Sequence, residues 1–143
     1  MVSIRRVSIS DYKDIYMLNK ELGYLYEEEK VRKKIKYIIE NKKDIILVAY
    51  INNNIIGYIH GSEYELLYSD SLINILVFVV KESYRKNGVG TALIDKLEEI
   101  AIEKKYFGIR LVSGIDREDA HRFYERNGYI YRKEQKNFIK LFS

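Results

Sequence analysis

A short basic loop containing two glycines follows an apolar run near the middle of the chain. The run is Val77–Val80, and the loop is Arg85-Lys86-Asn87-Gly88-Val89-Gly90-Thr91. The loop leads into an amphipathic stretch that predicts a helix from Gly90 to Lys104. The first N–H groups of a helix lie at the positive end of its dipole and bind phosphate, and glycines let an anion approach the backbone closely. The sequence therefore predicts a site for a nucleotide-like ligand.

Two common phosphate-binding motifs do not match this loop. The dinucleotide fingerprint needs a third glycine three residues after Gly90, where Leu93 stands. A P-loop needs the tripeptide Gly-Lys-Ser/Thr, which occurs nowhere in the chain. For the loop taken alone, an ordinary turn between a strand and a helix is the alternative.

A second block, Ala120-His121-Arg122-Phe123-Tyr124 with Gly128-Tyr129, begins about thirty residues after the loop. The loop resembles the Arg/Gln-x-x-Gly-x-Gly/Ala pyrophosphate motif of the GNAT family of N-acetyltransferases. The second block resembles the C-terminal signature of that family, Ala-x-x-x-Tyr-x-x-x-Gly-Phe/Tyr. With Arg117 before it, the block is similar to those of aminoalkylphosphonate and other small-amine acetyltransferases. The resemblance covers the whole chain and implies one domain, residues 1–143.

The resemblance implies that acetyl-CoA gives its acetyl group directly to a primary amine, on a small molecule or on a protein lysine or N-terminus. Tyr124 would be the general acid that protonates the departing thiolate, because a neutral phenol donates a hydrogen bond at pH 7. Since the chain has 14 tyrosines, a core aromatic is the alternative for Tyr124. The implied cofactor-binding residues are Phe78, Val79 and Val80 for the pantetheine arm, and Arg85, Lys86, Asn87, Gly88, Val89, Gly90 and Thr91 for the pyrophosphate. Arg117 is a further candidate for a cofactor contact, although it departs from the asparagine that the family commonly has at this position.

The predicted acceptor site departs from the family's pattern at one position. Many relatives carry a glutamate four residues before Phe78, where this chain has Asn74. An amide cannot take a proton from an alkylammonium, whose pKa is near ~10. Glu63 is the predicted general base, and a plain exposed carboxylate is its equal alternative. Further candidates are Glu21, Glu65 and Asp70. Tyr24 and Tyr26 are expected to line the amine site with Asn74, or else to pack against helices.

A catalytically weak acyl-CoA-binding sensor or partner module is the alternative function, and Asn74 favours it. Composition argues against several other features. The chain has 143 residues, no cysteine and a net charge of +4, so a disulfide, a metal site and a nucleic-acid partner are not expected. No apolar run approaches membrane-spanning length, so a cytoplasmic protein without a membrane partner is expected. A small-molecule amine is the expected partner, and relatives suggest a homodimer.

The elements that must position these residues follow from hydrophobic periodicity. A mixed α/β sheet flanked by helices is predicted, in the order β-α-α-β-β-β-α-β-α-β, which is also the order of the GNAT fold. The helices are predicted to start at Ser10 or Asp11 and end at Gly23, and to span 27–41, 90–104 and 116–127. The strands are predicted at 3–8, 45–51, 55–65, 73–80 and 108–113, with one or two more in 129–142. The strand at 73–80 is expected to be buried on both faces.

Overall fold

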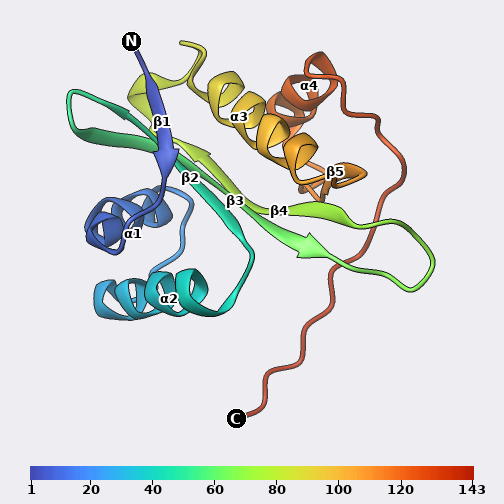
Figure 1. The fold of residues 1–143 in the computed structure, drawn as a ribbon, viewed down its shortest axis with the longest axis horizontal. Coiled ribbons are helices and arrows are strands. Elements are labelled where there is room, and N and C mark those ends of the chain that lie inside the picture. Colours follow the sequence, from blue (N-terminus) through green and yellow to red (C-terminus); the bar gives the residue numbers. More distant parts are fainter. The chain divides into compact units, whose positions relative to one another are not determined.

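A computed structural model describes residues 1–143, and the chain forms two compact units, Met1–Leu111 and Val112–Ser143. The first unit contains a five-stranded sheet and three α-helices, labelled in Figure 1. Its strands are β1 (Ser3–Arg6), β2 (Ile45–Ile51), β3 (Asn54–Tyr64), β4 (Leu72–Val80) and β5 (Gly108–Leu111). Its helices are α1 (Tyr12–Glu21), α2 (Glu28–Asn41) and α3 (Val89–Glu103), with 3-10 turns η1 (Ile9–Asp11) and η2 (Glu82–Tyr84).

The sheet has the strand order β1-β2-β3-β4-β5. Neighbouring strands are antiparallel except β4 and β5, which run parallel and are connected through α3. The turn between β2 and β3 holds Asn52 and Asn53 at φ values of 49° and 69°. Asparagine tolerates this left-handed conformation better than most residues. Three consecutive asparagines between two β-rich runs, residues 52–54, predict such a hairpin turn, and the structure confirms it.

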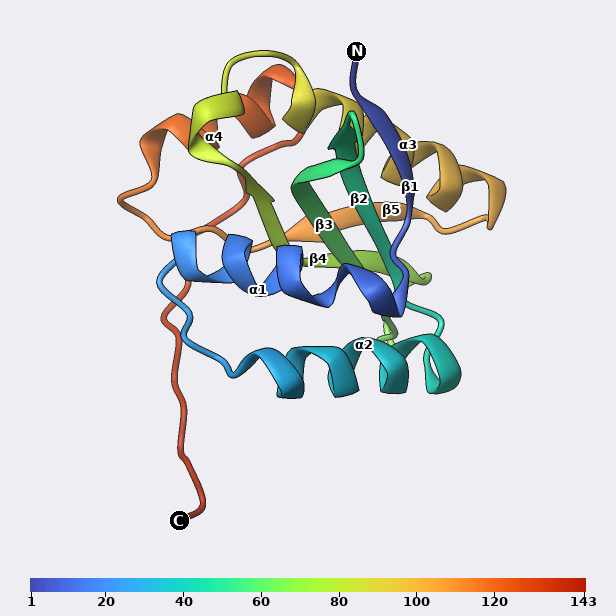
Figure 2. The same cartoon turned by 90° about the vertical axis from the view of Figure 1, so that its left-hand side faces the viewer.

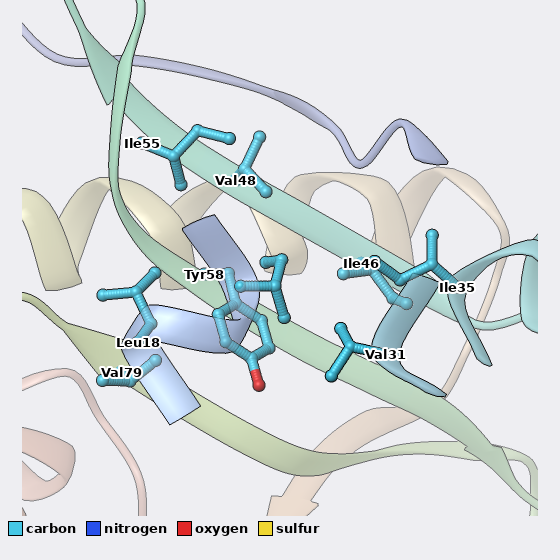
Figure 3. Packing of buried hydrophobic residues seen from close by; sticks show 9 residues of the cluster. Leu18, Val31, Ile35, Ile46, Val48, Ile55, Tyr58 and Val79 are labelled. Carbon is cyan, nitrogen blue, oxygen red and sulfur yellow. The ribbon is translucent and has the colours of Figure 1, made fainter. Parts of the chain in front are cut away.

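Helices cover both faces of the sheet in the first unit: α1 and α2 lie on one side, and α3 lies on the other (Figures 1 and 2). On the first side, a buried apolar cluster joins both helices to β2, β3 and β4 (Figure 3). Ile15 and Leu18 of α1 and Val31 and Ile35 of α2 supply the helix side of this cluster, as their helical spacing predicted. We call this side of the sheet the α1–α2 face.

Close packing marks the other side, which we call the α3 face. A Cβ added to Gly61 of β3 would lie 2.7 Å from Cγ2 of Ile73 and 3.4 Å from Leu97 of α3. Gly61 and Ile73 therefore face α3. Side chains alternate between the two faces along a strand, so Asn74 lies on the α1–α2 face.

The start of α1 differs in one detail from the expectation. Asp11 does precede the helix, but its carboxylate caps no helical N–H group. It instead accepts hydrogen bonds from the Arg5 guanidinium at 2.8 and 2.9 Å and from the N–H of Ser8 at 2.7 Å. Although burial favours its neutral form, these donors hold the pKa of Asp11 below its ordinary value. The contact ties β1 to the start of α1.

The second unit contains one helix, α4 (Glu118–Arg126), which ends just before Gly128 as predicted. Arg117, rather than the expected Asp116, is its N-cap residue. Residues 129–142 form no strand, so the last strand of the predicted order is missing. A strand needs an apolar face and a paired neighbour, but in this segment the charged run 132–136 separates exposed Ile130 from exposed Phe138.

Candidate functional site

The glycine loop connects η2 to α3 and forms a cradle of backbone donors. Gly88 is the N-cap residue of α3 and has a φ of 82°, a left-handed conformation that favours glycine. A Cβ added there would meet nothing within 4 Å, so the space beside the loop is open. The N–H of Ala92 bonds to the carbonyl oxygen of Gly88 at 3.0 Å. Because a helix leaves its first four N–H groups without internal acceptors, those of residues 88–91 are available to an anion.

Two cations flank this cradle. The Nε of Arg85 donates a hydrogen bond to the carbonyl oxygen of Val80 at 3.0 Å, which fixes the arginine to the end of β4. Lys86 is exposed, like Asn87 beside it, and has a φ of 65°. Neither cation forms a salt bridge. Both charges therefore add to the attraction for a phosphate group.

The strand that leads into the loop has an incomplete neighbour. The ladder between β4 and β5 ends at Ile75 and Leu111, so β5 pairs with none of residues 76–80. An extended ligand can add to a sheet edge of this kind through main-chain hydrogen bonds. Phe78, Val79 and Val80, the residues expected to pair with a pantetheine arm, all lie in this part of β4.

A β-bulge begins the same part of the strand. Along β3, His60 lies opposite Val77 while the next residue, Gly61, lies opposite Ile75, so Leu76 is an extra residue in β4. The bulge leaves the Leu76 side chain 53% exposed. The expectation that this strand is buried on both faces is therefore wrong here. Bulges bend a strand and are common beside active sites.

Asn74 is held by an arginine that sequence reasoning missed. In the sheet register Asn74 lies between Ser62 of β3 and Arg110 of β5. The Nη1 of Arg110 donates a hydrogen bond to Oδ1 of Asn74 at 2.6 Å. The same guanidinium lies over the ring of Tyr64, 4.4 Å from the ring centroid. At the position where the family resemblance predicts a glutamate, this chain thus has an amide bound to a cation. The signal that could have revealed Arg110 is the presence of an arginine inside the short predicted strand at 108–113.

Glu63, the predicted base, is not brought together with Asn74. Glu63 pairs with Ile73 in the register, so it lies on the α3 face, opposite to the face of Asn74. Its Oε2 accepts a hydrogen bond from the hydroxyl of Tyr106 at 2.6 Å. Burial and this carboxylate raise the pKa of Tyr106 to about 12. Glu63 is therefore engaged with Tyr106 on the α3 face.

The turn between α1 and α2 lies beside the entrance to the glycine loop. Tyr24 and Tyr26, the aromatic residues predicted for the amine site, are both in this turn and exposed. Glu21, the last residue of α1, accepts a hydrogen bond at Oε1 from the N–H of Glu82 at 3.1 Å. An open hollow of about 400 Å³ is lined by Glu21, Lys81, Glu82 and Ser83. The structure therefore places a carboxylate and an open space next to the loop.

Tyr124 lies in α4, in the second unit. Its ring makes edge-to-face contacts with Phe123 and Tyr129, with centroids 5.6 and 6.1 Å away. Burial raises the pKa of Tyr124, although Arg117 at the start of the helix acts in the opposite direction. A phenol with a raised pKa stays protonated at neutral pH, as a general acid must.

The two histidines have partners of their own. A ring nitrogen of His60 lies 2.7 Å from Oδ2 of Asp44, and one of His121 lies 2.8 Å from the carbonyl oxygen of Gly114. Three or more His, Asp or Glu side chains gather nowhere in a way that could hold a metal ion. None of the helices has the length and apolar character to cross a membrane.

Comparison with known sequences gives a family match across most of the chain. The model of the Acetyltransferase (GNAT) family matches residues 10–129. An uncharacterized N-acetyltransferase of Methanocaldococcus jannaschii is 24% identical over 121 residues, which cover 82% of this chain and 54% of that protein. The chain thus spans about half the length of this curated relative.

Solved structures share the fold. A GNAT family acetyltransferase from Staphylococcus aureus matches with a TM-score of 0.79 and 26% identity, covering 99% of this chain and 98% of that one. AAC(6')-Iy in complex with the bisubstrate analog CoA-S-monomethyl-acetylneamine matches with a TM-score of 0.86 and 14% identity, with 99% of both chains covered. At 14% identity the second likeness bears on the fold alone.

Proposed function

The chain belongs to the acetyltransferase (GNAT) family, and we propose that it transfers the acetyl group of acetyl-CoA to a primary amine. The cradle at the start of α3 carries this proposal. Gly88 takes a left-handed conformation before the helix, the space beside it is open, and Arg85 and Lys86 add charge. A ligand with a pyrophosphate group fits these donors better than a neutral ligand does.

Acetyl-CoA fits the residues present. The N–H groups of residues 88–91, with Arg85 and Lys86, would hold its pyrophosphate, and the edge formed by Phe78, Val79 and Val80 would pair with its pantetheine arm. Arg117, which stands where the family commonly has an asparagine, would add a further contact. When bound, acetyl-CoA supplies an acetyl group activated as a thioester. Because the acceptor amine would attack the thioester directly, the residues of the chain have to hold the amine and the thioester in the geometry that attack requires.

Tyr124 is proposed as the general acid, with Tyr24, Tyr26 and Asn74 lining the acceptor site. The phenol of Tyr124 would donate a proton where charge develops on the leaving sulfur, and its raised pKa keeps that proton in place at pH 7. Glu63 stays a prediction for the base, although it lies on the face opposite to Asn74. We therefore propose that the acceptor amine reaches the site deprotonated. Cytoplasmic location and a homodimer also stay predictions.

A catalytically weak acyl-CoA-binding module is the second candidate, favoured by the amide of Asn74 bound to Arg110. Turnover separates the two functions. The chain has no cysteine, so a thiol reagent detects released CoA without background from the protein. We expect thiol release that matches acetylated amine, identified by mass, when the full chain meets acetyl-CoA and a panel of primary amines. Binding of acetyl-CoA without any acetylated product would support the module instead.

A further inference from the structure

Arg110 is a half-buried cation with no anionic partner. Its interactions are the hydrogen bond to Asn74 and the contact with the Tyr64 ring. It forms no salt bridge. A guanidinium carries five N–H donors, and the bond to Asn74 uses one of them. Arginine that is partly withdrawn from water binds carboxylates through two parallel hydrogen bonds when one is offered.

The neighbours of Arg110 on the sheet are neutral. A row of register partners crosses the α1–α2 face, from Ser62 through Asn74 to Arg110, with Tyr64 beside it. All four side chains are half-buried. The buried cluster under α1 and α2 takes Val79 from β4 but no residue of the Ser62–Asn74–Arg110 row. The row is therefore polar, and none of its members is fully buried.

From this row we infer that the acceptor of the proposed reaction is a primary amine that carries a carboxylate, bound by Arg110 with the help of Asn74. The inference rests on the proposed function and names its substrate class. Asn74 fixes the guanidinium, and a single positive charge matches one carboxylate. A phosphoryl dianion would leave one negative charge without a partner. A polycationic amine would meet a like charge at this point.

The position suits an acceptor of modest length. With a rise of about 3.3 Å per residue, Leu76 lies about 7 Å along β4 from Asn74, and Phe78 lies about 13 Å away. Both residues lie in the part of β4 that does not pair with β5. An amine near that part and a carboxylate at Arg110 can therefore belong to one small molecule, such as a short amino acid.

Ligand binding tests the inference without turnover. The full chain, saturated with CoA, is titrated with glycine, β-alanine and 4-aminobutyrate and with the amide of each acid, using ligand-detected NMR. Because a charged hydrogen-bonded pair is lost, Arg110→Met should weaken binding of the best acid by about tenfold or more and that of its amide by less than about twofold. Comparing the same ligand on parent and variant cancels differences in amine pKa. Arg6→Met, which removes an exposed arginine from β1, is the matched control and should change the binding of neither the acid nor its amide.

A second variant keeps the test decisive if Arg110→Met does not fold. Asn74→Asp supplies an internal carboxylate that pairs with Arg110, so the preference for acids over amides should disappear while the melting temperature is kept. An equal loss of acid and amide binding in Arg110→Met would assign the arginine a purely structural role and overturn the inference. Tighter binding of O-phosphoethanolamine than of every acid would overturn the choice of a carboxylate.

Failure of this inference is distinguishable from failure of the proposed function. If acetyl-CoA is turned over with neutral amines as fast as with acids, and Arg110→Met changes neither rate, the function stands and the inference fails. If no amine releases thiol from acetyl-CoA while acids still bind through Arg110, the carboxylate site stands and the proposed function fails.

Discussion

The two halves of β4 belong to one strand, yet they offer a ligand different things. Residues 76–80, which we call the cofactor half, run past the end of β5 and lead to the glycine loop, so they offer main-chain groups and a helix start. Residues 72–75, the acceptor half, pair on both sides and use their main chain within the sheet. They offer side chains instead, chiefly Asn74 with its partner Arg110.

This difference explains why the cofactor is easier to assign than the acceptor. Main-chain N–H groups are the same whichever residues carry them, so a backbone site depends little on which side chains surround it. A site made of side chains changes with each substitution. Fold-level likeness therefore informs the cofactor half and says little about the acceptor half.

The largest effect is expected from Tyr124→Phe, which removes the proposed acid without removing the ring. We expect kcat to fall by roughly 10²–10⁴-fold, with the Kd for acetyl-CoA unchanged, because the proposed acid acts in the chemical step and not in cofactor binding. Thiol release and calorimetry measure the two quantities. An unchanged kcat would identify Tyr124 as a core aromatic.

The pH dependence of kcat/KM gives the next largest effect, because the acceptor half carries the amide of Asn74 and we propose that the amine arrives deprotonated. With an alkylamine of pKa near ~10, kcat/KM should rise about tenfold per unit between pH 7 and pH 9, as the free amine does. Burial raises the pKa of Tyr124, so the acid stays protonated over this range and its loss should begin only above the ordinary tyrosine value. A plateau beginning near pH 7 would instead reveal a carboxylate base.

Gly88→Val should act on the cofactor half alone. A left-handed conformation costs a residue with a Cβ about 1–2 kcal/mol, and the added side chain points into the open space of the cradle. We expect the Kd for acetyl-CoA to rise about tenfold or more while acceptor binding is kept. Gly23→Val is the matched control, since Gly23 has a φ of 93° and nothing within 4 Å of an added Cβ. An equal rise in the Kd for acetyl-CoA in both variants would contradict a special role of Gly88 in binding the cofactor.

The smallest effect is expected from Glu63→Gln, because Glu63 lies on the α3 face. Glutamine keeps an acceptor oxygen for the Tyr106 hydroxyl but removes the charge, so the free energy of unfolding should fall by less than about 1 kcal/mol, with the pH profile of kcat/KM unchanged. Urea unfolding and rate profiles measure this. Tyr106→Phe removes the donor of this hydrogen bond and keeps the carboxylate, so it should lower the free energy of unfolding at least as much and also leave the pH profile unchanged. A changed pH profile in Glu63→Gln alone would restore Glu63 as the base.

Local patterns predicted much of the fold. Helical spacing in α1 and α2, the asparagine turn after β2 and the glycine loop before α3 all depend on neighbours in sequence. The loop was interpretable because its function lies in the backbone, and Gly88 adopts the conformation that only glycine favours.

Features set by distant residues were not predictable in the same way. The bond between Arg110 and Asn74 depends on the parallel register of β4 and β5, which joins residues 36 positions apart. The bulge at Leu76 depends on the pairing with β3, and the bond between Tyr106 and Glu63 joins a loop to a strand end. The composition of residues 129–142 predicted one or two strands, but a strand forms only where it finds a neighbour to pair with.

The most direct test of the central claim is a calorimetric titration of the full chain with acetyl-CoA, with free CoA and ATP titrated in parallel. The account predicts acetyl-CoA binding with a micromolar Kd, little binding of ATP, and a clear loss of acetyl-CoA affinity in Gly88→Val. No binding of acetyl-CoA at millimolar concentration would contradict the account, and the glycine loop would then be an ordinary turn between β4 and α3.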